Sequence, residues 1–244
     1  MRATKVLVVA AVLAADVAVR PAAAEDGWKY TIAPYMMGAA MDGWIQVRGK
    51  AAEVNVPFDQ IWSNLHFGAM VHFDMKNDRW LISSDLTYMD LRQDAEVRTG
   101  TGQAQVKETL FEATGGYRVS PGVALLAGAR LVDLSAKLSF TGANANVSGD
   151  QSKSWVDPLV GVQLTLTFSE RWWLDARLDA GGFGVGSKQA WHEYANLYYR
   201  PSDHVSVFVG YQALDMEYQT GSGSNLFRYD VLSSGPQVGV AFHF

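Results

Sequence analysis

The sequence contains no cysteine, and this absence removes several kinds of chemistry at once. Without cysteine there is no disulfide framework, no thiol nucleophile and no cysteine-ligated metal. Basic residues are also few, with 20 Lys and Arg against 25 Asp and Glu, and they form no cluster large enough to neutralise a row of phosphates. We therefore exclude nucleic acid as a partner.

Long apolar runs are missing as well, apart from the N-terminal segment. Beyond that segment, no stretch approaches the roughly 18 consecutive apolar residues of a transmembrane helix. The chain nevertheless carries 8 Trp, 10 Tyr and 11 Phe. Some other pattern must place these rings.

Residues 1–24 have the three parts of a secretory signal peptide. Arg2 and Lys5 form a basic start, residues 6–15 form an apolar stretch, and residues 22–24 match a small-residue cleavage site. We predict that this segment is removed on export and that residues 25–244 form one domain. The mature protein is more acidic than the full chain, because the segment holds more basic than acidic residues.

Apolar residues alternate with other residues along most of the mature chain. From Trp172 one set of alternate positions is entirely apolar, whereas the other set reaches Asp175, Arg177 and Asp179. A period of two is typical of a strand, since neighbouring side chains point to opposite faces. Comparable alternation runs through residues 67–74, 80–91, 107–119, 123–131, 156–168, 191–199, 205–213 and 238–244.

These strands are long enough to cross a bilayer. A tilted membrane strand needs roughly 9 to 11 residues, whereas strands of globular sandwiches average about five or six. In lipid every backbone group must be paired, so the strands must close into a barrel. Aromatic residues close to predicted strand ends, such as Trp80, Trp172 and Tyr199, match interfacial girdles.

The connections predict the strand number. Short polar turns occur at residues 76–79, 120–122, 169–171 and 201–203, and longer segments rich in Gly, Ser and Asn occur at residues 93–105, 141–154, 185–189 and 219–225. Outer-membrane barrels have short periplasmic turns and longer external loops. Four short turns, with both termini at the periplasmic end, give a closed antiparallel barrel of about ten strands, within a range of eight to twelve.

This count treats residues 41–65 as a long first external segment. Within it, Phe58, Ile61, Trp62 and Leu65 follow the i, i+3, i+4, i+7 spacing of an amphipathic helix. We predict a short helix whose apolar face folds into the barrel mouth as a partial plug, or lies across the rim. If residues 44–56 form a membrane hairpin instead, the count becomes twelve.

Several residues do not fit a regular barrel. Pro34, Pro158 and Pro236 fall inside predicted strands, where each removes a ladder hydrogen bond, so we expect bulges there. The apolar phase also changes after Ala213, and Glu193 falls on an outward face. We expect both features near or beyond the outer rim, where either face contacts water.

The C-terminal residues Val238, Val240, Phe242 and Phe244 alternate and end in phenylalanine. This resembles the terminal signal by which outer-membrane barrels are recognised by their assembly machinery. The stretches at residues 155–161 (WVDPLVG) and 181–187 (GGFGVGS) resemble a broad, largely uncharacterised group of small Gram-negative outer-membrane proteins. The resemblance implies a fold, the outer membrane as the location, and membrane lipids and the assembly machinery as partners. It implies no catalytic residue, cofactor or oligomeric state.

Charged residues recur at positions predicted to face the lumen. Either these charges line a pore and select solutes, or opposite charges pair across strands and fill a narrow lumen. The second arrangement is favoured because clear aqueous channels appear at about 16 strands. The candidate selectivity residues are Asp85, Glu112, Arg130, Asp157, Asp175, Arg177 and Asp179; Glu108, Arg118 and Arg200 also face inward.

An enzyme is disfavoured. The nearest approach to a catalytic triad is Ser187, His192 and Glu193, but neighbours on a strand point to opposite faces, so Glu193 cannot orient His192. The five histidines do not cluster, and we predict no metal site and no cofactor.

The sequence therefore predicts an outer-membrane barrel that is a narrow passive channel or a structural component. An alternative is a surface-exposed binding or adhesion protein, anchored by the barrel, that uses residues 93–105 and 141–154. A third is a lipid or peptide hydrolase with its site at the rim. If the barrel conducts, neutralising Asp175 and Asp179 should lower its preference for cations.

Overall fold

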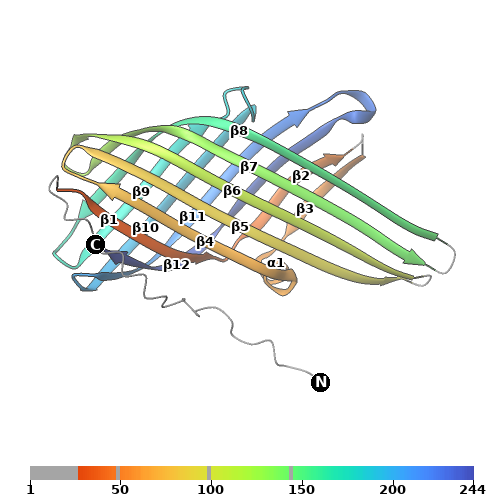
Figure 1. Cartoon of the computed structure of the whole chain (residues 1–244), viewed down its shortest axis with the longest axis horizontal. Coiled ribbons are helices and arrows are strands. Elements are labelled where there is room, and N and C mark those ends of the chain that lie inside the picture. Colours follow the sequence, from red (N-terminus) through yellow and green to blue (C-terminus); the bar gives the residue numbers. More distant parts are fainter. Residues whose placement is uncertain (1–26, 48–49, 98–99, 143–144) are drawn as a thin grey trace, which may run out of the picture.

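The computed structural model describes residues 27–47, 50–97, 100–142 and 145–244, and almost all of them lie in strands (Figure 1). The predicted signal peptide lies outside the described residues. Among the described residues, no helix is long and apolar enough to cross a membrane. The elements are β1 (Lys29–Met37), β2 (Ala40–Val47), β3 (Lys50–Val56), α1 (Phe58–Asn64), β4 (Leu65–Lys76), β5 (Trp80–Val97), β6 (Gly100–Ser120), β7 (Val123–Gly142), β8 (Ala145–Thr167), β9 (Trp172–Gly181), β10 (Gln189–Ser202), β11 (Val205–Thr220), the 3-10 helix η1 (Gly223–Asn225) and β12 (Phe227–His243).

Ten strands close into an antiparallel barrel, which confirms the predicted fold class. β1 pairs with β4, each strand from β4 to β11 pairs with the next, and β12 pairs back with β1. The closing ladder aligns Ile32 with Phe242 and Tyr35 with Gly239. Closure pairs both edges of every strand in the ring, as a barrel in lipid requires.

β2 and β3 form a hairpin that continues the wall beyond β1. The first part of β12 pairs with β2, and β2 pairs with β3. Among the described pairings β3 bonds to β2 alone, so the hairpin adds no strand to the closed ring. The barrel therefore has ten strands and not twelve.

The predicted short helix is present as α1, which connects β3 to β4 and packs against β2 and β5. β3 and β5 share no ladder in the described sheet, and α1, which follows β3, contacts β5. Ile61 is buried there, whereas Phe58 and Trp62 are about half exposed.

The strands extend to different distances at the two ends of the barrel. At one end, which we call the turn end, short turns join β4 to β5, β6 to β7, β8 to β9 and β10 to β11, and the chain finishes there (Figure 1). At the opposite end, the tall end, β5 to β8 project far beyond the other strands (Figure 1). These four strands have 18, 21, 20 and 23 residues.

The tall end corrects one expectation. Residues 93–105 and 141–154 are not long loops, because Asp94 pairs with Gln103 and Ser139 pairs with Ser148. Backbone ladders continue through most of both segments. Ladder hydrogen bonds form between any residues that have N–H and C=O groups, so a search for apolar alternation misses this extension.

An apolar belt covers the outer surface of the barrel. On β7 and β8 it includes Leu125, Leu131, Val160 and Leu166, all exposed. At the turn end, Trp80 packs on Tyr117 and Trp172 on Tyr199, with ring centroids 5.1 and 4.7 Å apart. Aromatic pairs at the edge of an apolar belt are typical of a membrane interface.

Above this belt, towards the tall end, the polarity of the wall inverts. On β7 the outward Asp133 is exposed, whereas the inward Val132 and Leu134 are buried. The change of phase after Ala213 has the same cause. β11 pairs with β12 without interruption, and its inward Leu214 and Met216 are 6% and 2% exposed. The expectation that both faces there contact water is wrong.

The expected bulges at the three prolines are also absent. The ladders run through Pro34, Pro158 and Pro236 without a register shift. Each proline lies beside a break in a neighbouring ladder, so its missing N–H removes no bond that the ring needs. Pro158 stands just beyond the last β8–β9 pair, Leu159 with Gly181, and Pro236 faces the gap between β1 and β2.

Candidate functional site in the barrel lumen

A row of polar side chains follows the strand register along the inner face of the wall. Strand register aligns His72 of β4 with Asp85 of β5, Asp85 with Glu112 of β6, Glu112 with Arg130 of β7, and Arg130 with Asp157 of β8. Aligned residues of neighbouring strands have side chains on the same face and within contact distance. The register therefore assembles residues that are separated by up to 85 positions in the chain.

Four of the lumen residues form a closed ring of ion pairs, which we call the charged ring: Glu112, Arg130, Arg177 and Asp179. Arg130 Nη2 lies 2.7 Å from Glu112 Oε2 and 2.8 Å from Asp179 Oδ1. Arg177 contacts the same two carboxylates, with Nη2 2.5 Å from Glu112 Oε1 and Nε 2.9 Å from Asp179 Oδ2. Two cations thus balance two anions, and no side chain is more than 8% exposed.

The charged ring joins strands that are not neighbours, because β6 and β7 contact β9 across β8. Opposite Asp179, β8 carries Gly161, and a Cβ atom there would lie 2.6 Å from the Cβ of Asp179. His192 adds a fifth group, with Nδ1 3.2 Å from Asp179 Oδ2. The ring and His192 together place five polar side chains across this level of the lumen.

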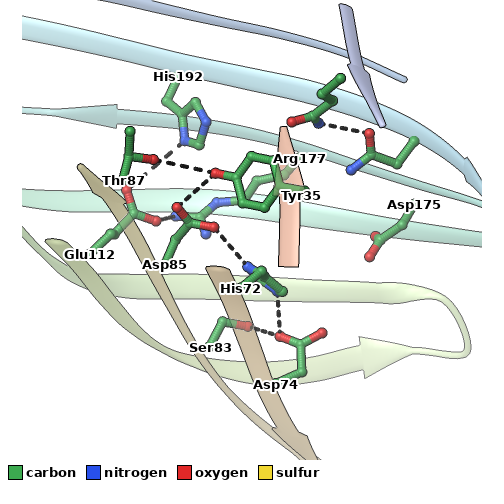
Figure 2. Close-up of polar contacts among 12 residues, drawn as sticks. Tyr35, His72, Asp74, Ser83, Asp85, Thr87, Glu112, Asp175, Arg177 and His192 are labelled. Atoms are coloured by element: carbon green, nitrogen blue, oxygen red, sulfur yellow. Dashed lines mark hydrogen bonds and ion pairs between the residues drawn. The ribbon is translucent and has the colours of Figure 1, made fainter. Parts of the chain in front are cut away.

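A second polar cluster occupies the lumen beside the ring (Figure 2). His72 lies between two carboxylates, with Nε2 3.0 Å from Asp74 Oδ1 and Nδ1 3.2 Å from Asp85 Oδ2. The Tyr35 hydroxyl donates to Asp85 at 2.9 Å, and Ser83 donates to Asp74. This cluster links β1, β4 and β5, so polar contacts continue around the barrel.

Two further predicted charges, Asp175 and Arg200, lie closer to the turn end. Asp175 accepts both contacts from the Gln163 amide, at 2.9 and 3.0 Å. The Arg200 guanidinium lies over the ring of Trp173, 4.8 Å from its centroid, and Trp173 stacks on Tyr198. The structure thus places all seven candidate selectivity residues in the lumen, and their role in selectivity stays a prediction.

The two stretches at residues 155–161 and 181–187 contact each other directly. Ser187 donates to Asp157 through its backbone N–H at 2.5 Å and through its hydroxyl at 2.7 Å. The Trp155 indole donates to the Ser187 hydroxyl at 2.9 Å. Asp157 and Ser187 are both fully buried. The β9–β10 connection is therefore fastened to β8, a contact that the sequence reasoning missed.

Above the charged ring the lumen is apolar. A cluster of buried side chains lies there, and Trp155 of β8 stacks on Tyr218 of β11 with ring centroids 4.0 Å apart. Because β8 and β11 are three strands apart in the ring, this pair spans the lumen. We call this region the apolar outer lumen; its buried members are Ala39, Met41, Ile61, Val132, Leu134, Trp155, Ala190, Leu214, Met216, Phe227, Tyr229 and Val231.

The lumen also contains the donor types of a metal site. Ligand atoms of Glu112, Asp179 and His192 lie within 4.8 Å of one another. Both carboxylates are already bridged by Arg130 and Arg177, whose charges repel a metal cation. These residues therefore do not fit a metal ion in this arrangement.

Other predicted residues are placed outside the ring. The structure does not assemble the weak triad, because His192 is buried in the lumen whereas Glu193 is exposed on the outer face.

Of the residues of the predicted plug, Ile61 of α1 is buried, and Leu65, the first residue of β4, is half-buried. Phe242 pairs with Val205 and Ile32 in the closing ladder, and Phe244 is exposed at the turn end.

No protein-family model matches the chain, and no curated protein matches it in sequence. Among solved structures, the outer membrane protease OmpT from Escherichia coli aligns over 90% of this chain and 97% of its own, with a TM-score of 0.54 and 10% identity. The translocator domain of the autotransporter NalP from Neisseria meningitidis gives a TM-score of 0.47 at 12% identity, covering 88% of each chain. Ail, the attachment invasion locus protein of Yersinia pestis, gives 0.41 at 14%, covering 89% of this chain and 99% of its own. The likeness to OmpT shows a shared fold, that of the outer-membrane β-barrels.

Proposed function

We propose that this protein is an integral outer-membrane barrel whose lumen is closed to solutes, and which serves as a structural component of the membrane. The observation that carries the proposal is the charged ring. Its two arginines and two carboxylates are paired at 2.5 to 2.9 Å and are almost fully buried. A solute would have to separate these pairs to pass.

A second layer supports closure. The Trp155–Tyr218 stack and the cluster around it cross the lumen directly above the ring. Separating buried ion pairs and apolar contacts in the same movement has a high free-energy cost. Of the two forms of the first prediction, channel and structural component, the geometry favours the structural component.

The proposed orientation follows from the belt and the ends. Lipid covers the apolar belt, the turn end faces the periplasm, and the tall end faces outward. The C-terminal strand, with Phe242 on its outer face and Phe244 at its end, presents the signal to the assembly machinery. The signal peptide directs export.

Conductance of the mature chain, residues 25–244, in a planar bilayer tests closure. We expect a folded barrel, recognised by heat-modifiable gel mobility, that gives no discrete current steps. The variant that combines Glu112→Ser and Arg130→Ser with Trp155→Ala opens both the ring and the apolar layer above it, and it should conduct. Glu170→Ser with Arg171→Ser, in the exposed β8–β9 turn, is the matched control and should stay silent. Regular current steps from the unmodified protein would refute closure.

A second candidate function is binding at the cell surface, and the length of β5 to β8 favours it. Crossing a bilayer takes roughly 9 to 11 residues, yet these strands have 18 to 23. Deleting residues 95–102 and 140–147 would shorten both hairpins at the pairs Asp94–Gln103 and Ser139–Ser148. Lost attachment of cells with an intact barrel would support this function, and unchanged attachment would count against it.

A further inference from the structure

Glu108 is a buried carboxyl in the apolar outer lumen. It faces inward from β6, opposite Met89 of β5 and Leu134 of β7. Only 6% of the residue is exposed, and its Oε2 has no hydrogen-bond partner. Glu108 forms no hydrogen bond or ion pair with any residue that the structure describes.

The charged ring is too far away to satisfy Glu108. Glu112 is four residues along the same strand, which is roughly 13 Å at the rise of a β-strand. The register row between Glu108 and Glu112 holds the inward side chains of Leu110, Val132 and Trp155. This row separates the Glu108 carboxyl from the charged ring. Glu108 is therefore separate from the ring that closes the lumen.

A cation in the same register row as Glu108 is engaged elsewhere. Lys153 of β8 faces inward two strands from Glu108, with Leu134 between them in the register. Its Nζ lies over the ring of Phe227, 5.7 Å from the centroid. The barrel itself thus places an ammonium group against an aromatic face of the outer lumen.

Carboxylates and aromatic faces are the groups that bind organic cations. The outer lumen presents both, because Trp155, Tyr218, Phe227 and Tyr229 pack together at this end. Leu91 and Val106, the next inward pair after Met89 and Glu108 towards the tall end, are only partly buried. A ligand can approach Glu108 from the tall end without crossing the charged ring.

We propose that the apolar outer lumen binds a small organic cation, an ammonium group on an apolar body. The ammonium donates to the Glu108 carboxylate, and the apolar body packs against side chains such as Met89, Leu91 and Val106. The proposal goes beyond the structural role, because it concerns binding above the ring and requires no passage through it. Conductance tests the ring, and ligand binding tests Glu108, so either can fail alone.

Two ligands of matched shape test the proposal. Phenethylamine carries the ammonium group, and 2-phenylethanol replaces it by a hydroxyl. We expect calorimetry of the mature barrel in lipid nanodiscs, corrected with empty nanodiscs, to show at least tenfold tighter binding of the amine. Glu108→Gln keeps the shape of the side chain and should remove this preference. Glu193→Gln, on the exposed outer face, should leave it unchanged.

Three results would overturn the proposal. The first is an unmodified barrel that does not bind the amine or does not prefer it to the alcohol, a comparison that needs no variant. The second is an undiminished preference in folded Glu108→Gln. The third is loss of the preference in folded Lys153→Met, since removing a competing internal ammonium should preserve or strengthen amine binding.

Discussion

The two halves of the lumen are built from the same strands and have opposite chemistry. On β6 the inward residues change from Glu112 to Leu110, and on β7 from Arg130 to Val132. On the outer surface the order is reversed, since Leu131 is apolar and Asp133 is charged. Between Leu131 and Val132 of β7, going towards the tall end, the inner face of the wall therefore becomes apolar and the outer face becomes polar.

This exchange reports where the surrounding solvent changes. Beside lipid, apolar residues face outward and the polar ones must pair inside the barrel. Above the lipid, water surrounds the wall, and the same strands bury their apolar residues as a soluble protein does. The charged ring and the apolar outer lumen are two solutions to the same requirement, that the interior of a narrow barrel be filled.

The largest effect is expected from breaking the charged ring. Arg130→Met leaves Glu112 and Asp179 each short of one cation in a buried site. We expect the free energy of unfolding to fall by about 3–5 kcal/mol, measured by urea titration in phospholipid vesicles. Arg171→Met in the exposed turn is the control and should change stability by less than about 0.5 kcal/mol. If both variants lose the same free energy of unfolding, the ion pairs of the ring contribute no more to stability than an exposed charge.

The apolar half should respond to lost volume rather than lost charge. Met216→Ala removes a side chain that is 2% exposed in the outer lumen. Its cavity should cost about 2–4 kcal/mol in the same titration. Val209→Ala on the exposed outer face of β11 is the control, and its effect should be clearly smaller.

A matched pair of glutamates sharpens the comparison. Glu112→Gln removes an anion that two arginines contact, and we expect a loss of about 2 kcal/mol. Glu108→Gln removes a buried carboxyl whose Oε2 has no hydrogen-bond partner, and stability should stay within about 0.5 kcal/mol or rise. If Glu108→Gln is the more damaging change, Glu108 has a structural partner and the assignment of the two halves is wrong.

The smallest effect is expected where the β9–β10 connection is fastened at the boundary between the halves. Ser187→Ala removes the hydroxyl that donates to Asp157 but keeps the backbone N–H contact. A loss of about 1 kcal/mol is expected in the urea titration. Ser154→Ala, exposed on β8, serves as the reference and should be neutral.

Much of the fold could be predicted from the sequence because lipid enforces a strict period of two. Alternation such as that from Trp172 to Ala180 predicts the strands, and short turns such as residues 169–171 separate them, so the strand number follows without any tertiary information. Above the belt the period of two continues with its faces exchanged, as Val132 and Asp133 of β7 show, and polar residues in residues 93–105 and 141–154 hide the extension of β5 to β8 from a search for apolar strands. The period also misleads at Leu214, whose apolar side chain turns inward instead of outward.

The charged residues of the lumen could be predicted, but their pairing could not. Alternation places Glu112, Arg130 and Asp179 inside the barrel one strand at a time. Which of them meet depends on the register between β6, β7, β8 and β9, and on Gly161 opposite Asp179. Nothing local in the sequence indicates Asp179 as the partner of His192, or Asp157 as the partner of Ser187.

Accessibility of single cysteines on either side of the ring tests closure most directly, and the natural absence of cysteine makes the labelling unambiguous. Arg118→Cys lies in the lumen at the turn end, and Ala136→Cys lies in the lumen wall at the tall end. A charged, membrane-impermeant thiol reagent added at the tall end should label position 136 and leave position 118 unreacted. Labelling of position 118 from the tall end in a folded barrel would contradict a closed lumen.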